Sequence, residues 1–106
     1  MLGQITAPQL QQRLARGDAI ILLDVRELEE VALARLPNVV HIPMGDIPGR
    51  IHELDPDAET VVICHHGIRS ANVAQFLAHH DFTCVLNLSG GVDAWSLLVD
   101  PTVPRY

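Results

Sequence analysis

The segment Ala19-Ile20-Ile21-Leu22-Leu23 contains no polar residue, and this run restricts the fold more than any other feature of the chain. A strand with one face in water alternates apolar and polar residues, whereas a strand of a parallel sheet is covered on both faces and is apolar throughout. Further strands are expected at a brief segment around Ile5 and at three later places: Val39–Ile42, Thr60–Ile63 and Cys84–Leu88.

Helical segments separate these strands. Thr6 is placed to cap the first helix, which ends at Gly17. Strands that alternate with helices predict an α/β fold with a mostly parallel central sheet and helices on both faces. The tail Asp100–Tyr106 is expected to be extended. Four more helices are expected: Glu27–Leu33, Asp46–Leu54, Ala71–His79 and Val92–Leu98.

The composition fits one domain over residues 1–106. Hydrophobic residues make up 48 % of the 106 positions, which is enough for one packed core and argues against disorder. Asp and Glu outnumber Lys and Arg by 13 to 7, and the net charge of −6 with no basic stripe argues against a nucleic-acid partner. We expect a soluble cytoplasmic monomer. The chain has only two cysteines, it has no apolar run of membrane length, and its N-terminus lacks a signal-peptide pattern.

Three candidate functional segments lie where predicted strands end: Asp24, Cys64 and Ser89-Gly90-Gly91. The carboxyl ends of parallel strands meet at one edge of a sheet, where functional groups gather. Cys64 opens the loop Cys64-His65-His66-Gly67-Ile68-Arg69-Ser70, which leads into a helix. Loop N–H groups, the positive end of the helix and the charge of Arg69 all favour a thiolate, so Cys64 is predicted to be a nucleophile.

Four motifs of the chain resemble those of the rhodanese family of sulfurtransferases. They occur in the family's order, and the resemblance covers almost the whole chain. Cys64 to Ser70 fits the family's Cys-x-x-Gly-x-Arg-Ser/Thr loop, and Asp24-Val25-Arg26 followed by Glu30 fits its Asp-Val-Arg segment and acidic residue. The chain departs from the family at Ala34–Asn38, where Gly-His-Ile before a Pro-Gly turn is frequent. The other two matching segments are His41-Ile42-Pro43 and Leu88–Trp95, which contains a Gly-Gly-x-x-Ala-Trp motif.

The resemblance implies a rhodanese-like fold and a thiosulfate sulfurtransferase that needs no cofactor. Cys64 would attack the outer sulfur of an anionic donor such as thiosulfate, release sulfite and hold a persulfide. Cyanide in assays, or a thiol or protein cysteine in cells, would then accept that sulfur. The loop from His65 to Ser70, Ile68 included, would bind substrate and present its N–H groups to the anion, and Gly67 would allow the chain to curl.

The side chains around Cys64 have alternative interpretations. Arg69 either orients the sulfonate of the donor or pairs with an acidic residue of the fold, and we favour the substrate role because Arg suits anionic oxygens. Ser70 either caps the helix or donates to the sulfur, and capping is favoured. At most one of His65 and His66 is expected to face the sulfur, where a protonated imidazole would hold the donor or assist deprotonation.

Other residues are assigned supporting roles. Asp24 and Arg26 are expected to pair with a nearby charge and to support the loop rather than to take part in chemistry. Trp95 is expected in the core, and Cys84, inside an apolar strand, is expected to be inert. The histidines occur as adjacent pairs without the i, i+4 spacing of helical metal ligands, so no metal is expected.

The sequence bears on three rival functions. Phosphatases and arsenate reductases on the same scaffold have a Cys-x5-Arg loop, whereas Cys64 and Arg69 are separated by four residues, and the shorter loop suits a single sulfur atom. A binding module without catalysis is disfavoured because Cys64, Gly67 and Arg69 are all present. A persulfide carrier that serves one protein partner stays open.

Overall fold

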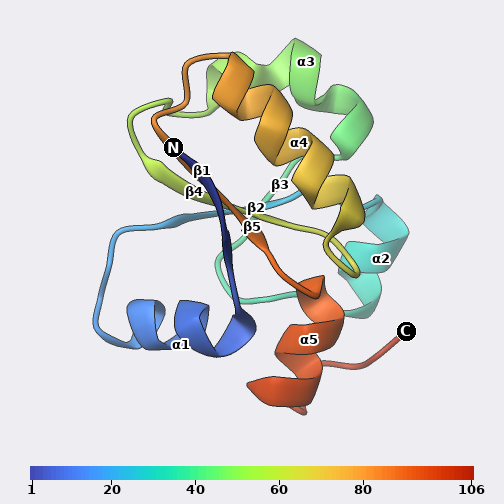
Figure 1. Ribbon diagram of the computed structural model, residues 1–106. Coiled ribbons are helices and arrows are strands. Elements are labelled where there is room, and N and C mark those ends of the chain that lie inside the picture. Colours follow the sequence, from blue (N-terminus) through green and yellow to red (C-terminus); the bar gives the residue numbers. More distant parts are fainter.

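The computed structural model describes residues 1–106 and shows a five-stranded sheet between helices (Figure 1). The strand order is β1-β5-β4-β2-β3, and every neighbouring pair is parallel, which confirms the expected α/β class. In chain order the elements are β1 (Leu2–Ile5), α1 (Ala7–Ala15), β2 (Ile21–Asp24), α2 (Leu28–Leu33), β3 (Val40–His41), α3 (Ile47–Arg50), β4 (Glu59–Ile63), α4 (Ile68–His79), β5 (Cys84–Leu88) and α5 (Gly91–Leu98).

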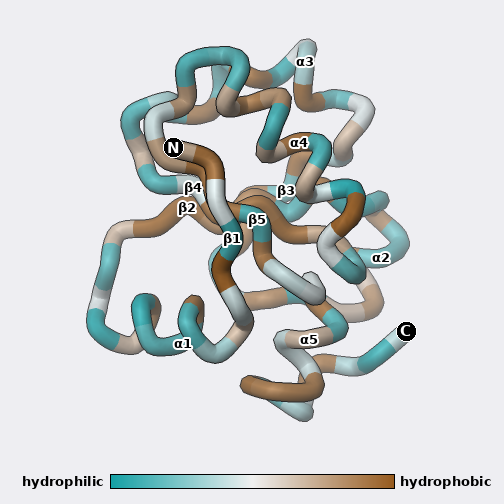
Figure 2. Tube along the Cα trace, viewed as in Figure 1, coloured by the Kyte–Doolittle hydropathy of each residue, from teal (hydrophilic) through white to brown (hydrophobic).

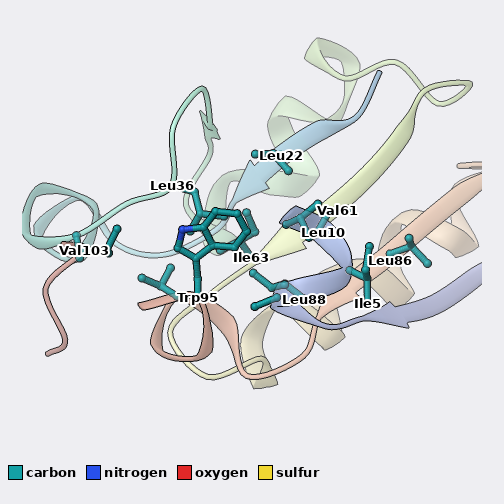
Figure 3. Close-up of a cluster of buried hydrophobic side chains, with 13 residues drawn as sticks. Ile5, Leu10, Leu22, Leu36, Val61, Ile63, Leu86, Leu88, Trp95 and Val103 are labelled. Atoms are coloured by element: carbon teal, nitrogen blue, oxygen red, sulfur yellow. The ribbon is translucent and has the colours of Figure 1, made fainter. Parts of the chain in front are cut away.

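Both faces of the sheet are buried, which explains why its central strands are mostly apolar (Figures 1 and 2). Successive residues of β4 enter opposite cores: Val61 and Ile63 pack with α1 and α5, whereas Val62 packs with α3 and α4. Trp95 fills the first of these cores, as expected (Figure 3). None of the helices has the length and apolar character that a bilayer crossing requires.

The helix predictions are confirmed in outline and are wrong in two places. Thr6 caps α1 as expected, because its hydroxyl accepts the N–H of Gln9 at 3.2 Å. The segment predicted as one helix from Asp46 to Leu54 is a four-residue helix between two 3-10 turns, because Pro48 lacks an N–H and Gly49 is a poor helix former. The helix after Cys64 begins at Ile68, three residues earlier than predicted.

Candidate active site

Cys64 directly follows the last residue of β4 and opens the short loop into α4. Gly67 ends this loop with a φ of 102°, a left-handed conformation that favours glycine. A Cβ on Gly67 would also lie 3.2 Å from both the Leu88 carbonyl oxygen and the Gly90 nitrogen, so the position needs glycine for space as well. The curl turns the first N–H groups of α4 towards the sulfur.

The sulfur of Cys64 lies inside a set of hydrogen-bond donors, with only 1 % of the residue exposed. The N–H of Gly67 donates to Sγ at 3.1 Å, and the Ser70 hydroxyl lies 3.2 Å from it. Burial works to raise the pKa of Cys64, but the Ser70 hydroxyl and the N–H groups of Ser70, Gly67 and His66 outweigh it, so this pKa lies below the usual thiol value. The site therefore stabilises a thiolate.

The favoured capping role of Ser70 is wrong. The helix begins at Ile68 and Gly67 is its N-cap, so Ser70 lies within the first turn rather than before it. Its side chain is fully buried and points to the sulfur. The sequence pattern placed the start of this helix three residues too late, at Ala71, so the Ser70 hydroxyl was interpreted as a cap rather than as a donor to the sulfur.

The Gly90-Gly91 pair allows the start of α5 to pack closely against the loop and to hydrogen-bond to its carbonyls. The N–H of Val92 donates to the Cys64 carbonyl at 2.9 Å, and the N–H of Asp93 donates to the His65 carbonyl at 3.1 Å. A Cβ on Gly91 would collide with both carbonyl oxygens. With these carbonyls bound to α5, the loop is free to present its N–H groups to the sulfur.

Asp24 and Arg26 form an ion pair behind the loop, and neither side chain is exposed to solvent. The guanidinium donates Nε to Oδ1 at 2.9 Å and Nη2 to Oδ2 at 2.7 Å. It also donates to the carbonyls of Ala34 at 2.6 Å and Glu30 at 3.2 Å. The structure thus brings together the two residues that the sequence assigned to support.

Arg69 faces an acidic partner in the structure. Its two terminal nitrogens bind the Glu30 carboxylate at 2.6 and 2.7 Å, and this contact lowers the pKa of Glu30 to about 2. The contacts match the ion-pair interpretation of Arg69, the one that was not favoured. The pairing escaped sequence reasoning because 39 residues separate the partners.

Two aromatic contacts cover the loop on the solvent side. The His65 ring stacks between His66, at 3.9 Å between centroids, and Tyr106, at 3.8 Å. The Tyr106 hydroxyl accepts from Arg26 at 2.8 Å and donates to Glu30 at 2.9 Å, so it links the two ion pairs. Neither imidazole hydrogen-bonds to Sγ, and burial followed by the nearness of His66 lowers the pKa of His65, which favours its neutral form.

The predicted loop residues gather around one surface hollow of about 300 Å³, lined by Cys64, His65, His66, Ile68 and Arg69. Ile68 stands at the rim with 75 % of its surface exposed. Cys84 lies elsewhere, because it opens β5 at the opposite end of the strand from the loop. Burial, followed by Glu59, raises the pKa of Cys84, which leaves it a weak nucleophile.

One group of side chains beside the loop has metal-ligand chemistry. His65, His66 and Asp93 bring one ligand atom each within 4.8 Å of the others. Asp93 already pairs with Arg105 at 2.9 Å, and the two imidazole rings stack on each other.

Sequence reasoning missed two residues of the site. Asn87 lies beneath the loop, where its Oδ1 accepts from the Ser70 hydroxyl and its Nδ2 donates to the Gly67 carbonyl at 3.0 Å. A polar residue inside the otherwise apolar strand Cys84–Leu88 was a signal for it. Tyr106 left no such signal, because it stands outside every motif.

Comparison with known proteins gives one consistent result. The family model of the rhodanese-like domain matches residues 6–98. The chain is 44 % identical over 94 residues to YtwF of Bacillus subtilis (strain 168), which covers 89 % of this chain and 90 % of that protein. It is 35 % identical over 96 residues to a protein of Allochromatium vinosum named sulfurtransferase, covering 91 % and 90 %. The crystal structure of a rhodanese-like domain protein from Staphylococcus aureus superposes with a TM-score of 0.85 at 29 % identity, over 100 % of this chain and 99 % of that one.

Proposed function

Since this chain belongs to the rhodanese-like domain family, we propose that it is a sulfurtransferase that carries the transferred sulfur as a persulfide on Cys64. The observation that supports this most directly is the set of N–H and O–H donors around Sγ. The thiolate, not the thiol, is the nucleophile in sulfur transfer, and these donors stabilise the thiolate although the side chain is buried.

In the first half-reaction, the Cys64 thiolate attacks the outer sulfur of the donor. With thiosulfate, the bond between the two sulfur atoms of the donor breaks, sulfite leaves with the electron pair, and Sγ bonds to the outer sulfur. The negative charge moves onto that outer sulfur. It then lies at the N-terminus of α4, where backbone N–H groups stabilise an anion.

In the second half-reaction, an acceptor attacks the outer sulfur of the persulfide. A thiolate acceptor becomes a persulfide and cyanide becomes thiocyanate, while the Cys64 thiolate leaves and the enzyme is regenerated. Two separate displacements predict ping-pong kinetics. The acceptor approaches through the hollow that Ile68 and Arg69 border.

The loop side chains would guide the donor rather than react with it. Arg69 would offer the N–H groups that Glu30 leaves free to a sulfonate, with most of its charge already balanced. His65 and His66 would form the mouth, and Asp24 with Arg26 would hold the strand ends in place. The chain would act as a monomer in the cytoplasm, where thiol acceptors stay reduced.

Intact-protein mass after incubation with thiosulfate tests the proposal. The wild type and Cys84→Ser should each gain one sulfur atom, which cyanide removes, and Cys64→Ser should gain none. A folded, reduced wild type that gains no sulfur from thiosulfate would exclude this donor. Loading only from a protein persulfide would instead identify a carrier for a dedicated partner, and loading of Cys64→Ser would refute the role of Cys64.

A further inference from the structure

The Ser70 hydroxyl faces two acceptors and has one proton to donate. Its oxygen lies 3.2 Å from Cys64 Sγ and is also hydrogen-bonded to Asn87 Oδ1. All three side chains lie in the buried space between α4 and the sheet, where water does not supply a second donor. Only one of the two acceptors therefore receives the Ser70 proton at a time.

The orientation of Asn87 is fixed by its own donors. Its Nδ2 donates to the Gly67 carbonyl at 3.0 Å and to Gln4 Oε1 at 3.0 Å. An inverted amide would place its oxygen against the Gly67 carbonyl, which can only accept, so Oδ1 must face Ser70. Asn87 is thus held as a permanent competitor of the sulfur for the Ser70 proton.

We propose that Asn87 is a positioning residue that makes the Ser70 hydroxyl alternate with the loading of Cys64. When Cys64 is a thiolate, the hydroxyl donates to Sγ and leaves Asn87 Oδ1 without a partner. When Cys64 holds a persulfide, the hydroxyl donates to Asn87.

The alternation follows from where the charge lies. In the thiolate, Sγ carries the full charge and is the stronger acceptor of the two. Once Sγ has bonded to the outer sulfur, the charge resides on that outer atom and Sγ becomes a neutral, weakly accepting sulfur. A neutral thiol is likewise a weak acceptor, and it can donate its own proton to the Ser70 oxygen.

Asn87 therefore disfavours the thiolate relative to both the thiol and the persulfide, because only the thiolate leaves a buried amide oxygen unpaired. The free-energy cost of the unpaired amide oxygen therefore enters two equilibria equally: the ionisation of the Cys64 thiol and the loading of the thiolate with sulfur. Removal of the Asn87 oxygen should lower the pKa of Cys64 and should reduce the ratio of persulfide to thiolate by the matching factor. The inference rests on the proposed function only for the persulfide state.

The first measurement is the pH dependence of Cys64 alkylation by iodoacetamide, with Cys84→Ser in every variant so that one thiol reacts. Asn87→Leu should lower the pKa of Cys64 by about half a unit or more, and Ser70→Ala should raise it. In the Ser70→Ala background, Asn87→Leu should shift the pKa clearly less, because no proton remains to be contested and only the loss of the Gly67 contact acts. Asn87→Val, which suits a strand, is measured in parallel in case the leucine variant does not fold.

The double-variant comparison isolates the contested proton. Loss of the Gly67 contact accompanies both asparagine substitutions, but it is the same in both Ser70 backgrounds. The charged and titratable groups around Cys64 are untouched by the substitutions: Glu30, His65, His66, Arg69, Asp93 and Tyr106. An unchanged or raised pKa in Asn87→Leu, or an equal shift in both backgrounds, overturns the proposal.

The second measurement is the loaded fraction by intact mass, at a fixed ratio of thiosulfate to sulfite and a pH at which Cys64 is ionised in all variants. A pKa shift of half a unit corresponds to a roughly threefold lower ratio of persulfide to thiolate in Asn87→Leu. A pKa shift without that change in loading overturns the alternation. A wild type that loads from neither thiosulfate nor an alkyl persulfide refutes the proposed function and the alternation, while the alkylation curve still decides whether Asn87 competes for the proton.

Discussion

Asp24→Asn tests how strongly the ion pair behind the loop stabilises the fold. The substitution keeps the shape of the side chain and removes its charge, while Arg26 stays positively charged with no exposed surface. Its remaining partners are neutral: the carbonyls of Glu30 and Ala34 and the hydroxyl of Tyr106. An unpaired buried charge of this kind costs about 3–5 kcal/mol, a large part of the ~5–15 kcal/mol stability of a typical domain.

Urea unfolding followed by fluorescence measures this loss, because Trp95 is the only tryptophan and is buried in the core. The melting temperature should fall by about 12 °C or more. Asp57→Asn, at an exposed loop position, is the matched control and should stay within about 0.5 kcal/mol of the wild type. A double variant, Asp24→Leu with Arg26→Met, should lose less than Asp24→Asn alone, because it leaves no buried charge.

A loss below about 1 kcal/mol in Asp24→Asn would refute this reasoning, since an isolated buried charge cannot be so cheap. A double variant less stable than Asp24→Asn would refute it in another way. That result would mean that the hydrogen bonds of Arg26, rather than the balance of charge, hold the strand ends together.

Two further predictions concern the loop and its surroundings. Gly91→Ala should abolish sulfur loading from the assay donor, because the new Cβ meets the Cys64 carbonyl, whereas Gly49→Ala has open space and should load normally; equal loading would show that the loop tolerates the displacement. The folded-state pKa of Glu30, about 2 beside Arg69, is below its usual value, so this pair stabilises the protein above about pH 4.5 and the contribution is lost as pH falls towards 2. Glu30→Gln should remove that part of the pH dependence of the unfolding free energy. An unchanged pH profile would show that the pKa of Glu30 does not contribute to stability in this way.

The fold was accessible from the sequence because burial on both faces leaves a direct mark on composition. The apolar run at residues 19–23 and the strand before Cys64 were identified by this mark alone. The position of Cys64 followed as well, since a strand that gives way to a glycine-containing loop and a helix has few alternative geometries.

The contacts of the site were less accessible because they join distant parts of the chain. The partners Glu30 and Arg69 are 39 residues apart, and Tyr106 lies 76 residues from Glu30. No local pattern encodes such a pair, since each side chain is also a plausible surface residue. Ser70 shows a different limit: an error of three residues in the helix start is enough to change the role of a hydroxyl.

The contact of α5 with the loop sets an order of events during synthesis. The carbonyl of Cys64 finds its partner, the N–H of Val92, only after 28 further residues have been made, and Ser70 meets Asn87 only when β5 has joined the sheet. Parallel pairing of distant strands is a slow step of folding. A nascent chain that ends before α5 thus lacks both N–H groups that bind the carbonyls of Cys64 and His65, and the loop acquires its full set of contacts only when the last helix is in place.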